Sequence, residues 1–331
     1  MTLRNATTSG LAALAVVGLA AVTACSSSSS SSSSSAPASS APAASTSASA
    51  SGGASNPLGG GTASGSVVIG SANFPESEVL AEVYALALQA KGIKATTKLN
   101  IGSREVYYPQ VEKGAITIFP EYNGDLLSVA VDPTSTAKST AAVDAALAAK
   151  LPPSLEVLNP APAQDSDSVT VTAATAAKYH LTSIADLKPY ASSMVLGAPS
   201  EFKTRPYGIA GLKANYGLTF KSFDPLDESG PITLAALTSG KVQAADVFTT
   251  TPQIATDKLV TLADPKNNFA AQNVIPLVYK ADVTPTITAT LNAVSAKLTT
   301  QALIQMNIAA SINKENYSTV AEGFLKTIGM G

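Results

Sequence analysis

One pattern occurs twice in this chain and constrains its fold more than any other feature. The first copy, residues 114–125, joins a short apolar run to a Pro-Glu-Tyr-Asn-Gly turn. The second copy, residues 237–251, also places a Gly, a short apolar run and a polar turn after a helix-like segment. Each copy predicts a buried strand that ends at a polar loop, which is where open α/β sheets bind ligands. Two copies therefore predict two lobes that face one cleft.

The residues before the first copy alternate between predicted strands and helices. We expect strands at 66–71 and 93–99, and helices at 76–90 and 102–113. Pro75 suits the first turn of the first helix. Pro109 lies inside the second predicted helix, where it indicates a kink or a late start. This alternation is typical of a parallel α/β sheet.

A Pro-rich segment at 157–167 predicts a crossover into a second lobe. Short apolar runs predict strands of that lobe at 169–172, 195–197, 220–223 and 243–248. Residues 272–276 are the expected return crossover, after which 277–280 rejoin the first sheet and helices at 285–297, 301–311 and 318–328 pack on the first lobe. We therefore expect lobe 1 at 66–163 plus 275–331, and lobe 2 at 164–274. Two crossings of this kind imply a hinge.

The N-terminus has the composition of a secretory signal. Residues 1–24 carry one positive charge, Arg4, and then an apolar run that is short for a bilayer span. Cys25 is the only cysteine, and the preceding Val-Thr-Ala resembles the lipobox of bacterial lipoproteins, which implies lipidation of Cys25. Residues 25–65 are mostly Ser, Ala, Pro and Gly, and we expect a disordered tether there because they have almost nothing to bury.

The composition excludes several classes of function. After Cys25 the chain has no cysteine and only one histidine, His180, so disulfide frameworks, Cys/His pairs and His-rich metal sites are excluded. We expect His180 to end a helix, and we expect no cofactor. The formal net charge of −2 does not favour nucleic-acid binding, and the absence of a phosphate-binding Gly-Lys-Ser/Thr loop excludes an ATPase.

Residues 68–127 resemble the first lobe of the substrate-binding proteins of osmoprotectant ABC importers, the glycine betaine, choline and proline betaine group. The likeness continues at 160–165, 204–208, 225–227, 248–250 and 275–278, and spans nearly all of 67–330. It rests mainly on the Pro-Glu-Tyr-x-Gly and Thr-Arg-Pro-x-Gly turns in this order. The resemblance implies a two-lobed, type II binding-protein clamshell of mostly parallel sheets. It also implies a monomer without enzymatic activity, outside the cytoplasm, that delivers a small solute to a permease driven by an ATPase.

The resemblance also assigns two residues to the ligand. Tyr122 matches a wall of the aromatic cage that surrounds a quaternary ammonium, whose charge is attracted to ring faces. Arg205 matches the arginine that binds the ligand carboxylate. Two alternatives stay open from the residues alone, namely Tyr122 as a rim residue and Arg205 as a solvated or interlobe salt-bridge residue.

The chain departs from the family pattern in its cage. The second-lobe ring is Phe248, the positions near Asp167 and Gln272 carry no ring, and Asp125 stands where a Thr is usual. A thinner cage with more carboxylates predicts a solute that donates hydrogen bonds. The candidate ligand-binding residues are Asn73, Tyr122, Asn123, Asp125, Asp165, Asp167, Arg205, Phe248 and Thr249.

Other interpretations remain at this point. Tyr107 and Tyr108 are possible cage rings, although packing on the sheet is the simpler expectation. The carboxylates of Asp224, Asp227 and Glu228 are expected in a solvated loop. The same fold is also compatible with an amino acid or sugar-derived osmolyte, or with a sensor or adhesion lipoprotein. A deaminase of the porphobilinogen type, which shares a similar scaffold, needs a cysteine that the mature chain lacks.

Overall fold

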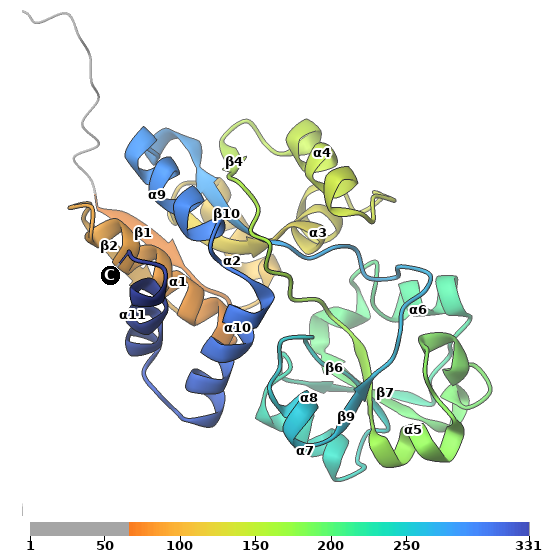
Figure 1. Cartoon of the computed structure of the whole chain (residues 1–331). Coiled ribbons are helices and arrows are strands. Elements are labelled where there is room, and N and C mark those ends of the chain that lie inside the picture. Colours follow the sequence, from red (N-terminus) through yellow and green to blue (C-terminus); the bar gives the residue numbers. More distant parts are fainter. Residues whose placement is uncertain (1–65, 331) are drawn as a thin grey trace, which may run out of the picture. The chain divides into compact units, whose positions relative to one another are not determined.

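The computed structural model describes residues 66–330, all within one compact unit, Gly60–Gly331 (Figure 1). The predicted signal segment, Cys25 and the tether at 25–65 lie outside the described residues. Between residues 66 and 330, no helix combines the length and apolar character needed to cross a membrane. In the same part of the chain, no group of His, Cys, Asp and Glu is arranged to hold a metal ion.

The first lobe is built on a five-stranded sheet of order β2-β1-β3-β10-β4. Its strands are β1 (Val67–Gly70), β2 (Ala95–Lys98), β3 (Ile118–Tyr122), β4 (Leu155–Val157) and β10 (Val274–Tyr279). Strand β10 is antiparallel to both β3 and β4, whereas the other strands share one direction. Val274 pairs with Tyr122 in this register, so the return segment meets the end of β3.

The second lobe repeats this arrangement in a sheet of order β7-β6-β8-β5-β9. Its strands are β5 (Val169–Thr172), β6 (Val195–Pro199), β7 (Ser222–Leu226), β8 (Ala244–Asp246) and β9 (Leu259–Thr261). Here β5 is the reversed strand. In each lobe the reversed strand is thus the one that enters from the other lobe, and four of five strands run the same way. The expected two-lobed fold class with mostly parallel sheets is confirmed.

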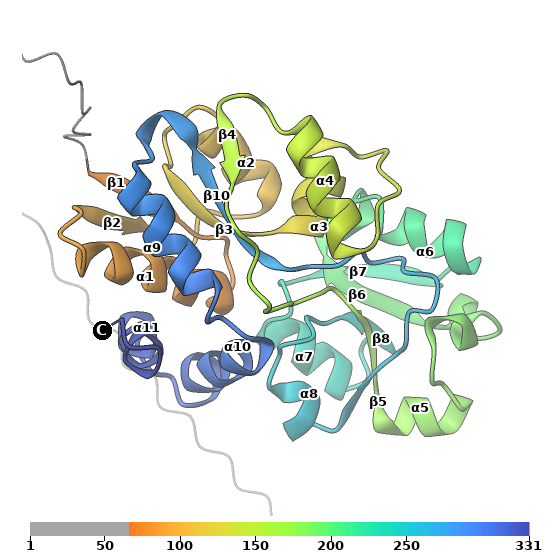
Figure 2. The ribbon, with the colours of Figure 1, turned by 45° about the horizontal axis from the view of Figure 1, so that its top comes forward.

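The helices of the first lobe cover both faces of its sheet. They are α1 (Pro75–Gln89), α2 (Arg104–Glu112), α3 (Asn123–Asp125), α4 (Thr140–Lys150), α9 (Pro285–Ser295), α10 (Thr300–Asn307) and α11 (Tyr317–Thr327), with π-helical turns η1 (Leu126–Val131) and η6 (Ile308–Ile312) and a 3₁₀ turn η5 (Lys280–Asp282). Helix α1 packs against the sheet and against α9 and α11 (Figure 2), which explains why it is apolar around most of its surface. Helix α2 begins at Arg104 and continues past Pro109, so of the two alternatives for this proline, a kink or a late start, the late start is wrong.

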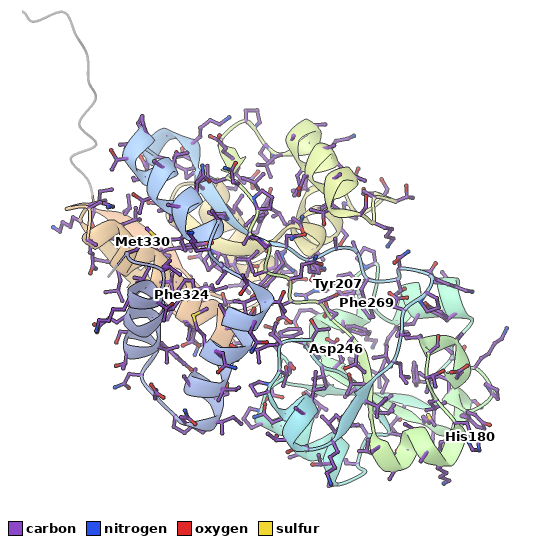
Figure 3. The ribbon with its side chains drawn as sticks, in the orientation of Figure 1. His180, Tyr207, Asp246, Phe269, Phe324 and Met330 are labelled. Atoms are coloured by element: carbon purple, nitrogen blue, oxygen red, sulfur yellow. The ribbon has the colours of Figure 1, made fainter. Side chains whose placement is uncertain are left out.

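The helices of the second lobe are shorter. They are α5 (Ala173–Tyr179), α6 (Ile209–Tyr216), α7 (Pro231–Thr238) and α8 (Gln253–Thr256), with 3₁₀ turns η2 (Ile184–Leu187), η3 (Ala191–Ser193) and η4 (Ser200–Lys203). His180 ends α5 in the left-handed conformation, with φ 54°, as expected. Figure 3 shows it at the edge of this lobe, away from Asp246.

The two crossover segments run side by side between the sheets. Ala161 N donates to Val274 O at 2.8 Å, Val274 N donates to Ala163 O at 3.1 Å, and Asp165 N donates to Gln272 O at 3.1 Å. These bonds satisfy the buried backbone of the crossovers and make a narrow two-chain connection. A short connection of this kind is where a hinge can absorb a change in lobe orientation.

Candidate ligand-binding site

A small cavity of about 40 Å³ lies where β3, β8 and the crossovers meet. It is lined by Ala72, Phe74, Ser103, Arg104, Tyr107, Tyr122, Asp125, Asp165, Asp167, Arg205, Glu228, Phe248 and Gln272. Six of the nine residues predicted from the sequence are brought together here, namely Tyr122, Asp125, Asp165, Asp167, Arg205 and Phe248. The loops after the ends of two strands, one from each lobe, therefore face the same space.

The other three predicted residues do not line this cavity. Asn123 is fully buried, and its Oδ1 accepts from Asn273 N at 2.8 Å, which fastens the turn after β3 to the return crossover. Thr249 is exposed, and its hydroxyl donates to Asp165 Oδ1 at 3.1 Å. Asn73 is also exposed. In the amide orientation that satisfies its neighbours, its side-chain nitrogen donates to Glu228 Oε2 at 3.2 Å. Thr249 and Asn73 thus contact residues that line the cavity, whereas Asn123 fastens the turn to the return crossover.

The turn after β3 requires glycine at position 124. A Cβ atom at Gly124 would lie 2.4 Å from the carbonyl oxygen of Ala271 in the return crossover. A Cβ atom does not approach a backbone oxygen this closely, so only glycine allows the turn after β3 to contact the return crossover. The Pro-Glu-Tyr-x-Gly pattern is therefore explained by the contact between this turn and the return crossover.

Three aromatic rings form one wall of the cavity. The ring centroids of Phe74 and Tyr122 are 6.2 Å apart, and those of Phe74 and Phe248 are 5.2 Å apart in an edge-to-face arrangement. Phe74 was not predicted as a site residue, although it stands directly before Pro75 at the start of α1 and links the two predicted rings. The residue before a proline is driven to an extended backbone, and Phe74 has φ −141° and ψ 151°. Its position directly before Pro75 is the only local sequence signal that points to Phe74 as part of this wall.

A buried ion pair supports the cavity from the first lobe. Arg104 Nε lies 2.9 Å from Glu121 Oε1, and Arg104 Nη2 lies 2.9 Å from Glu121 Oε2. Tyr107 donates its hydroxyl to Glu121 Oε1 at 2.7 Å, and Tyr122 N donates to Oε2 at 2.8 Å. Glu121 is fully buried, so this paired geometry is what makes its charge tolerable. The ring of Tyr107 stacks on Phe119 at 3.8 Å, as expected for a residue that packs on the sheet.

Asp125 is held by donors from three parts of the fold. Its carboxylate accepts from Tyr207 Oη at 2.6 Å, from Arg104 Nη1 at 3.4 Å and from Gln272 Nε2. Tyr207 belongs to the second lobe, where its ring packs beside Phe269 (Figure 3). Asp125 therefore joins both lobes and the return crossover, which the sequence pattern did not indicate.

Arg205 forms a salt bridge to the first lobe. Its Nε lies 3.2 Å from Glu105 Oε1 and its Nη2 lies 3.3 Å from Glu105 Oε2, while Nη1 lies 3.2 Å from Tyr207 Oη. Partial burial raises the pKa of Glu105, but the hydrogen bond and charge of Arg205 outweigh it and bring that pKa to about 2. The interlobe salt bridge considered from the sequence is thus present in the structure.

Asp167, which lines the cavity, lies beside the buried carboxyl group of Asp246. Burial raises the pKa of Asp246 to about 7, and burial together with the charge of Asp246 raises the pKa of Asp167 well above its usual value. Among the described residues, Asp246 Oδ1 has no hydrogen-bond partner. In this buried site the charge of Asp246 disfavours ionisation of Asp167.

The loop after β7 is ordered, and the expectation of a solvated carboxylate cluster there is wrong. Asp227 accepts from Thr233 N at 2.7 Å and from Ile232 N at 3.1 Å, so it caps α7. Asp224 pairs with Lys241 at 2.8 Å. Glu228 is buried and lines the cavity, where burial raises its pKa.

The cavity is lined by more carboxyl groups than basic groups. Four carboxyl groups and two guanidinium groups line it. Arg104 is paired with Glu121 and Arg205 with Glu105, so both positive charges are already matched. Burial raises the pKa values of Asp165, Asp167 and Glu228, and a cation bound beside the three rings would favour the charged forms of these carboxyl groups.

The family profile for the substrate-binding domain of ABC-type glycine betaine transport systems matches residues 65–327. The chain belongs to this family. The resemblance inferred from the two turns is therefore confirmed, and the chain is a solute-binding component of the ABC-importer type.

Individual relatives agree with the family assignment. The glycine betaine-binding protein YehZ of Escherichia coli is 27% identical over 280 residues, which cover 81% of this chain and 92% of that protein. The ergothioneine transport permease/ergothioneine binding protein EgtU of Helicobacter pylori is 26% identical over 165 residues, which cover 49% of this chain and 30% of that protein. The crystal structure of a glycine betaine/carnitine/choline ABC transporter shares the fold, with a TM-score of 0.64 at 24% identity, over 80% of this chain and 99% of the other.

Proposed function

We propose that this protein captures a small ammonium solute of the betaine type between its lobes and delivers it to a membrane permease. The observation that carries the proposal is the wall of Phe74, Tyr122 and Phe248 beside a cavity lined by carboxyl groups. A methylated ammonium cannot donate a conventional hydrogen bond, and it gains its energy from ring faces and nearby negative charge. Relatives of the family carry names that include glycine betaine, which agrees with this class of solute.

Capture depends on contacts that join the lobes around the solute. Such contacts include Tyr207 to Asp125, Arg205 to Glu105, and Thr250 to Glu76, where the Thr250 hydroxyl donates to Glu76 Oε2 at 2.6 Å. A solute that touches both lobes adds to these contacts only when the lobes are together. It therefore shifts the population toward the closed form, which is the form presented to the permease.

For a zwitterionic solute, Arg205 is the better placed arginine for the carboxylate. Its partner Glu105 has a side chain that is 44% exposed, so water can solvate Glu105 once a ligand carboxylate displaces it. Arg104 holds a fully buried Glu121, which would be left unpaired at a high cost in free energy. We therefore expect a ligand carboxylate to replace Glu105 at Arg205, whereas Arg104 keeps its ion pair with Glu121.

The family and the N-terminal sequence support proposals for the location, oligomeric state, membrane attachment and partners of the protein. We infer that the protein acts outside the cytoplasm as a monomer, attached to the membrane through lipid on Cys25 and a tether over residues 25–65. Its partners are the permease and the ATPase of an ABC importer. The same fold used as a sensor without transport is the alternative, and growth on the solute in a strain lacking the permease distinguishes the two.

Calorimetry with purified protein tests the solute class. The panel contains glycine betaine, choline, carnitine and ergothioneine, with a neutral amino acid and a sugar-derived osmolyte as contrasts. We expect binding of at least one methylated ammonium, and Phe74→Leu is expected to weaken it by up to about 2 kcal/mol, since the ring face is lost while an apolar side chain remains. Binding of the contrasts alone, or an ammonium affinity unchanged in Phe74→Leu, contradicts the proposal.

A further inference from the structure

One end of the first-lobe sheet carries a row of lysines. Strand β3 ends at the ligand cavity with Tyr122, and the opposite end of the sheet holds the start of β1. Four connections turn at that opposite end, from α1 to β2, from α2 to β3, from α4 to β4 and from β10 to α9. Each of them contains or borders an exposed lysine. We call these residues the lysine row, namely Lys91, Lys94, Lys113, Lys150 and Lys280.

Backbone hydrogen bonds join these connections side by side. The bonds across this end of the sheet include Val67 N to Lys94 O at 2.9 Å, Tyr279 N to Thr117 O at 2.8 Å, and Lys280 N to Ser154 O at 2.9 Å. Five strands at a spacing of about 4.8 Å give the row a width of about 20 Å. The lysine row is therefore one continuous surface at the end of the lobe, on the side away from the cavity.

The protein does not neutralise the lysine row. Between residues 66 and 330, none of its five lysines forms a salt bridge. Two exposed carboxylates, Glu112 and Asp282, lie in the same turns, so positive charge is in excess. Lysines after helices are expected from the helix dipole, but Lys94 precedes β2 and Lys280 follows β10. Helix ends alone thus do not explain the row.

The corresponding end of the second-lobe sheet is different. Its connections hold Lys221, Lys241 and Lys258. Lys241 is paired with Asp224 at 2.8 Å, and the exposed Asp257 stands directly before Lys258. The repeated lobe architecture therefore does not by itself produce such a row. The formal net charge of the whole chain is −2, so the lysine row is a local excess of positive charge.

The N-terminal segment joins the first lobe within this row. The described chain enters the sheet at Val67, with β2 on one side of β1 and β3 on the other (Figure 1). Residues 25–65 thus connect Cys25, the proposed lipid attachment site, to the end of the lobe that carries the lysines. Clustered lysines are attracted to anionic lipid headgroups within about one Debye length, about 8 Å at physiological ionic strength.

We propose that the lysine row docks on an anionic phospholipid surface and orients the first lobe at the membrane. The ammonium groups contact headgroup phosphates, and the ligand cavity at the other end of the sheet stays accessible to solute. This inference goes beyond the proposed function, because it assigns a resting position to the protein when it is not engaged with the permease. It rests on the proposed anchor only for the choice of a membrane over other polyanions.

Vesicle flotation tests this docking with the unacylated Cys25→Ser chain, so that no lipid anchor contributes. We expect binding to vesicles of phosphatidylglycerol and phosphatidylcholine at about 0.1 M ionic strength, and no binding at about 1 M salt or to phosphatidylcholine alone. Lys94→Gln, Lys113→Gln, Lys150→Gln and Lys280→Gln together should weaken binding by about tenfold or more. The matched control makes the same change at four exposed lysines of the second lobe, namely Lys178, Lys188, Lys213 and Lys221, and should retain binding within about twofold.

Fluorescence quenching by labelled headgroups measures the orientation. A dye is placed on Ala115→Cys, in the turn after Lys113, or on Ala177→Cys, on α5 of the second lobe, and both positions are exposed. We expect stronger quenching at position 115. Stronger quenching at position 177, or an equal loss of binding in the two fourfold variants, overturns the proposal.

Two further outcomes of the flotation experiment also overturn the docking. One is the absence of binding to the anionic vesicles at about 0.1 M ionic strength. The other is retention on immobilised poly(glycerol phosphate) without vesicle binding, which assigns the row to a polyanion other than a membrane. Cell fractionation of Cys25 variants tests the anchor separately, so the docking can fail while the anchor stands.

Discussion

The guanidinium group of Arg205 forms a salt bridge with the carboxylate of Glu105 between the lobes, with Nε 3.2 Å from Oε1 and Nη2 3.3 Å from Oε2. Arg205 follows η4 in the second lobe, and Glu105 lies in the first turn of α2 in the first lobe. The residue that the family resemblance assigns to a ligand carboxylate thus already holds a protein carboxylate. Any ligand carboxylate must compete with Glu105 for it.

This competition predicts opposite effects for the two partners. Arg205→Ala should weaken glycine betaine binding by about 1.5–3 kcal/mol, because a charge-assisted contact is lost. Glu105→Gln should leave that affinity equal or higher, since the competing charge is gone. Choline, which has no carboxylate, serves as the control ligand in titration calorimetry. If Arg205→Ala weakens choline and glycine betaine equally, the arginine acts only on lobe closure.

Tyr122 has two separable roles, one for its ring and one for its hydroxyl. The hydroxyl donates to Glu76 Oε1 at 2.5 Å, while the ring lies in the aromatic wall. Tyr122→Phe should lower the free energy of unfolding by about 1–3 kcal/mol, because a buried carboxylate loses a donor. Tyr122→Leu should in addition weaken ammonium binding by up to about 2 kcal/mol. Denaturation in urea and calorimetry separate the effects, and equal ammonium binding by the Phe and Leu variants would exclude the ring from the cage.

The Asp167–Asp246 pair predicts proton release when a cation binds. Burial raises the pKa of Asp246 from 3.8 to about 7, so at pH 7 the pair still carries a proton that an unfolded chain has lost. A cation in the cavity favours the charged form, and its affinity should therefore rise as the pH increases through about 7. For the same reason the stability of the unliganded protein should fall as the pH rises from about 4 to 7, because the folded state binds more protons in that window.

The dependence of the binding enthalpy on the buffer measures this proton release. Binding enthalpies at pH 7 in phosphate and in Tris should differ, since the two buffers take up the proton with different enthalpies. Asp246→Asn should remove the difference. Asp224→Asn is the control, because Asp224 pairs with Lys241 outside the cavity. Identical enthalpies in both buffers for the unaltered protein would show that the pair does not respond to the ligand.

Lipid attachment at Cys25 predicts a change in cellular fractionation. Cys25→Ala should move the protein from the membrane fraction to the medium or leave it as an uncleaved precursor, because the acyl chains are absent. Cys25→Ser is a matched variant that keeps the size of the side chain. Immunoblotting of membrane and medium fractions reads the result, and a cleaved form that stays in the membrane would refute the anchor.

The sequence by itself determined the lobes and the positions of two of the rings. Apolar runs of strand length, helix periodicity, and Pro and Gly at their ends are local signals, since they act through the backbone of neighbouring residues. They placed β5 at 169–172 as observed, and they put Tyr122 and Phe248 at the ends of two strands. In the structure Tyr122 is the last residue of β3, Phe248 follows β8, and both line one cavity. The strongest local signal, the Pro-Glu-Tyr-x-Gly turn, also reflects a steric need that only glycine meets.

The tertiary structure alone decided which charges meet. Arg205 and Glu105 are 100 positions apart, and Asn307 reaches Glu76 over 231 positions. The third ring, Phe74, joins the wall only because α1 and the loop after β8 come together. The raised pKa values of Asp167 and Asp246 likewise depend on burial and proximity, which no run of neighbouring residues encodes. The packing of the lobes decides which charged side chains become neighbours, so the charge of the site could not be predicted from the sequence.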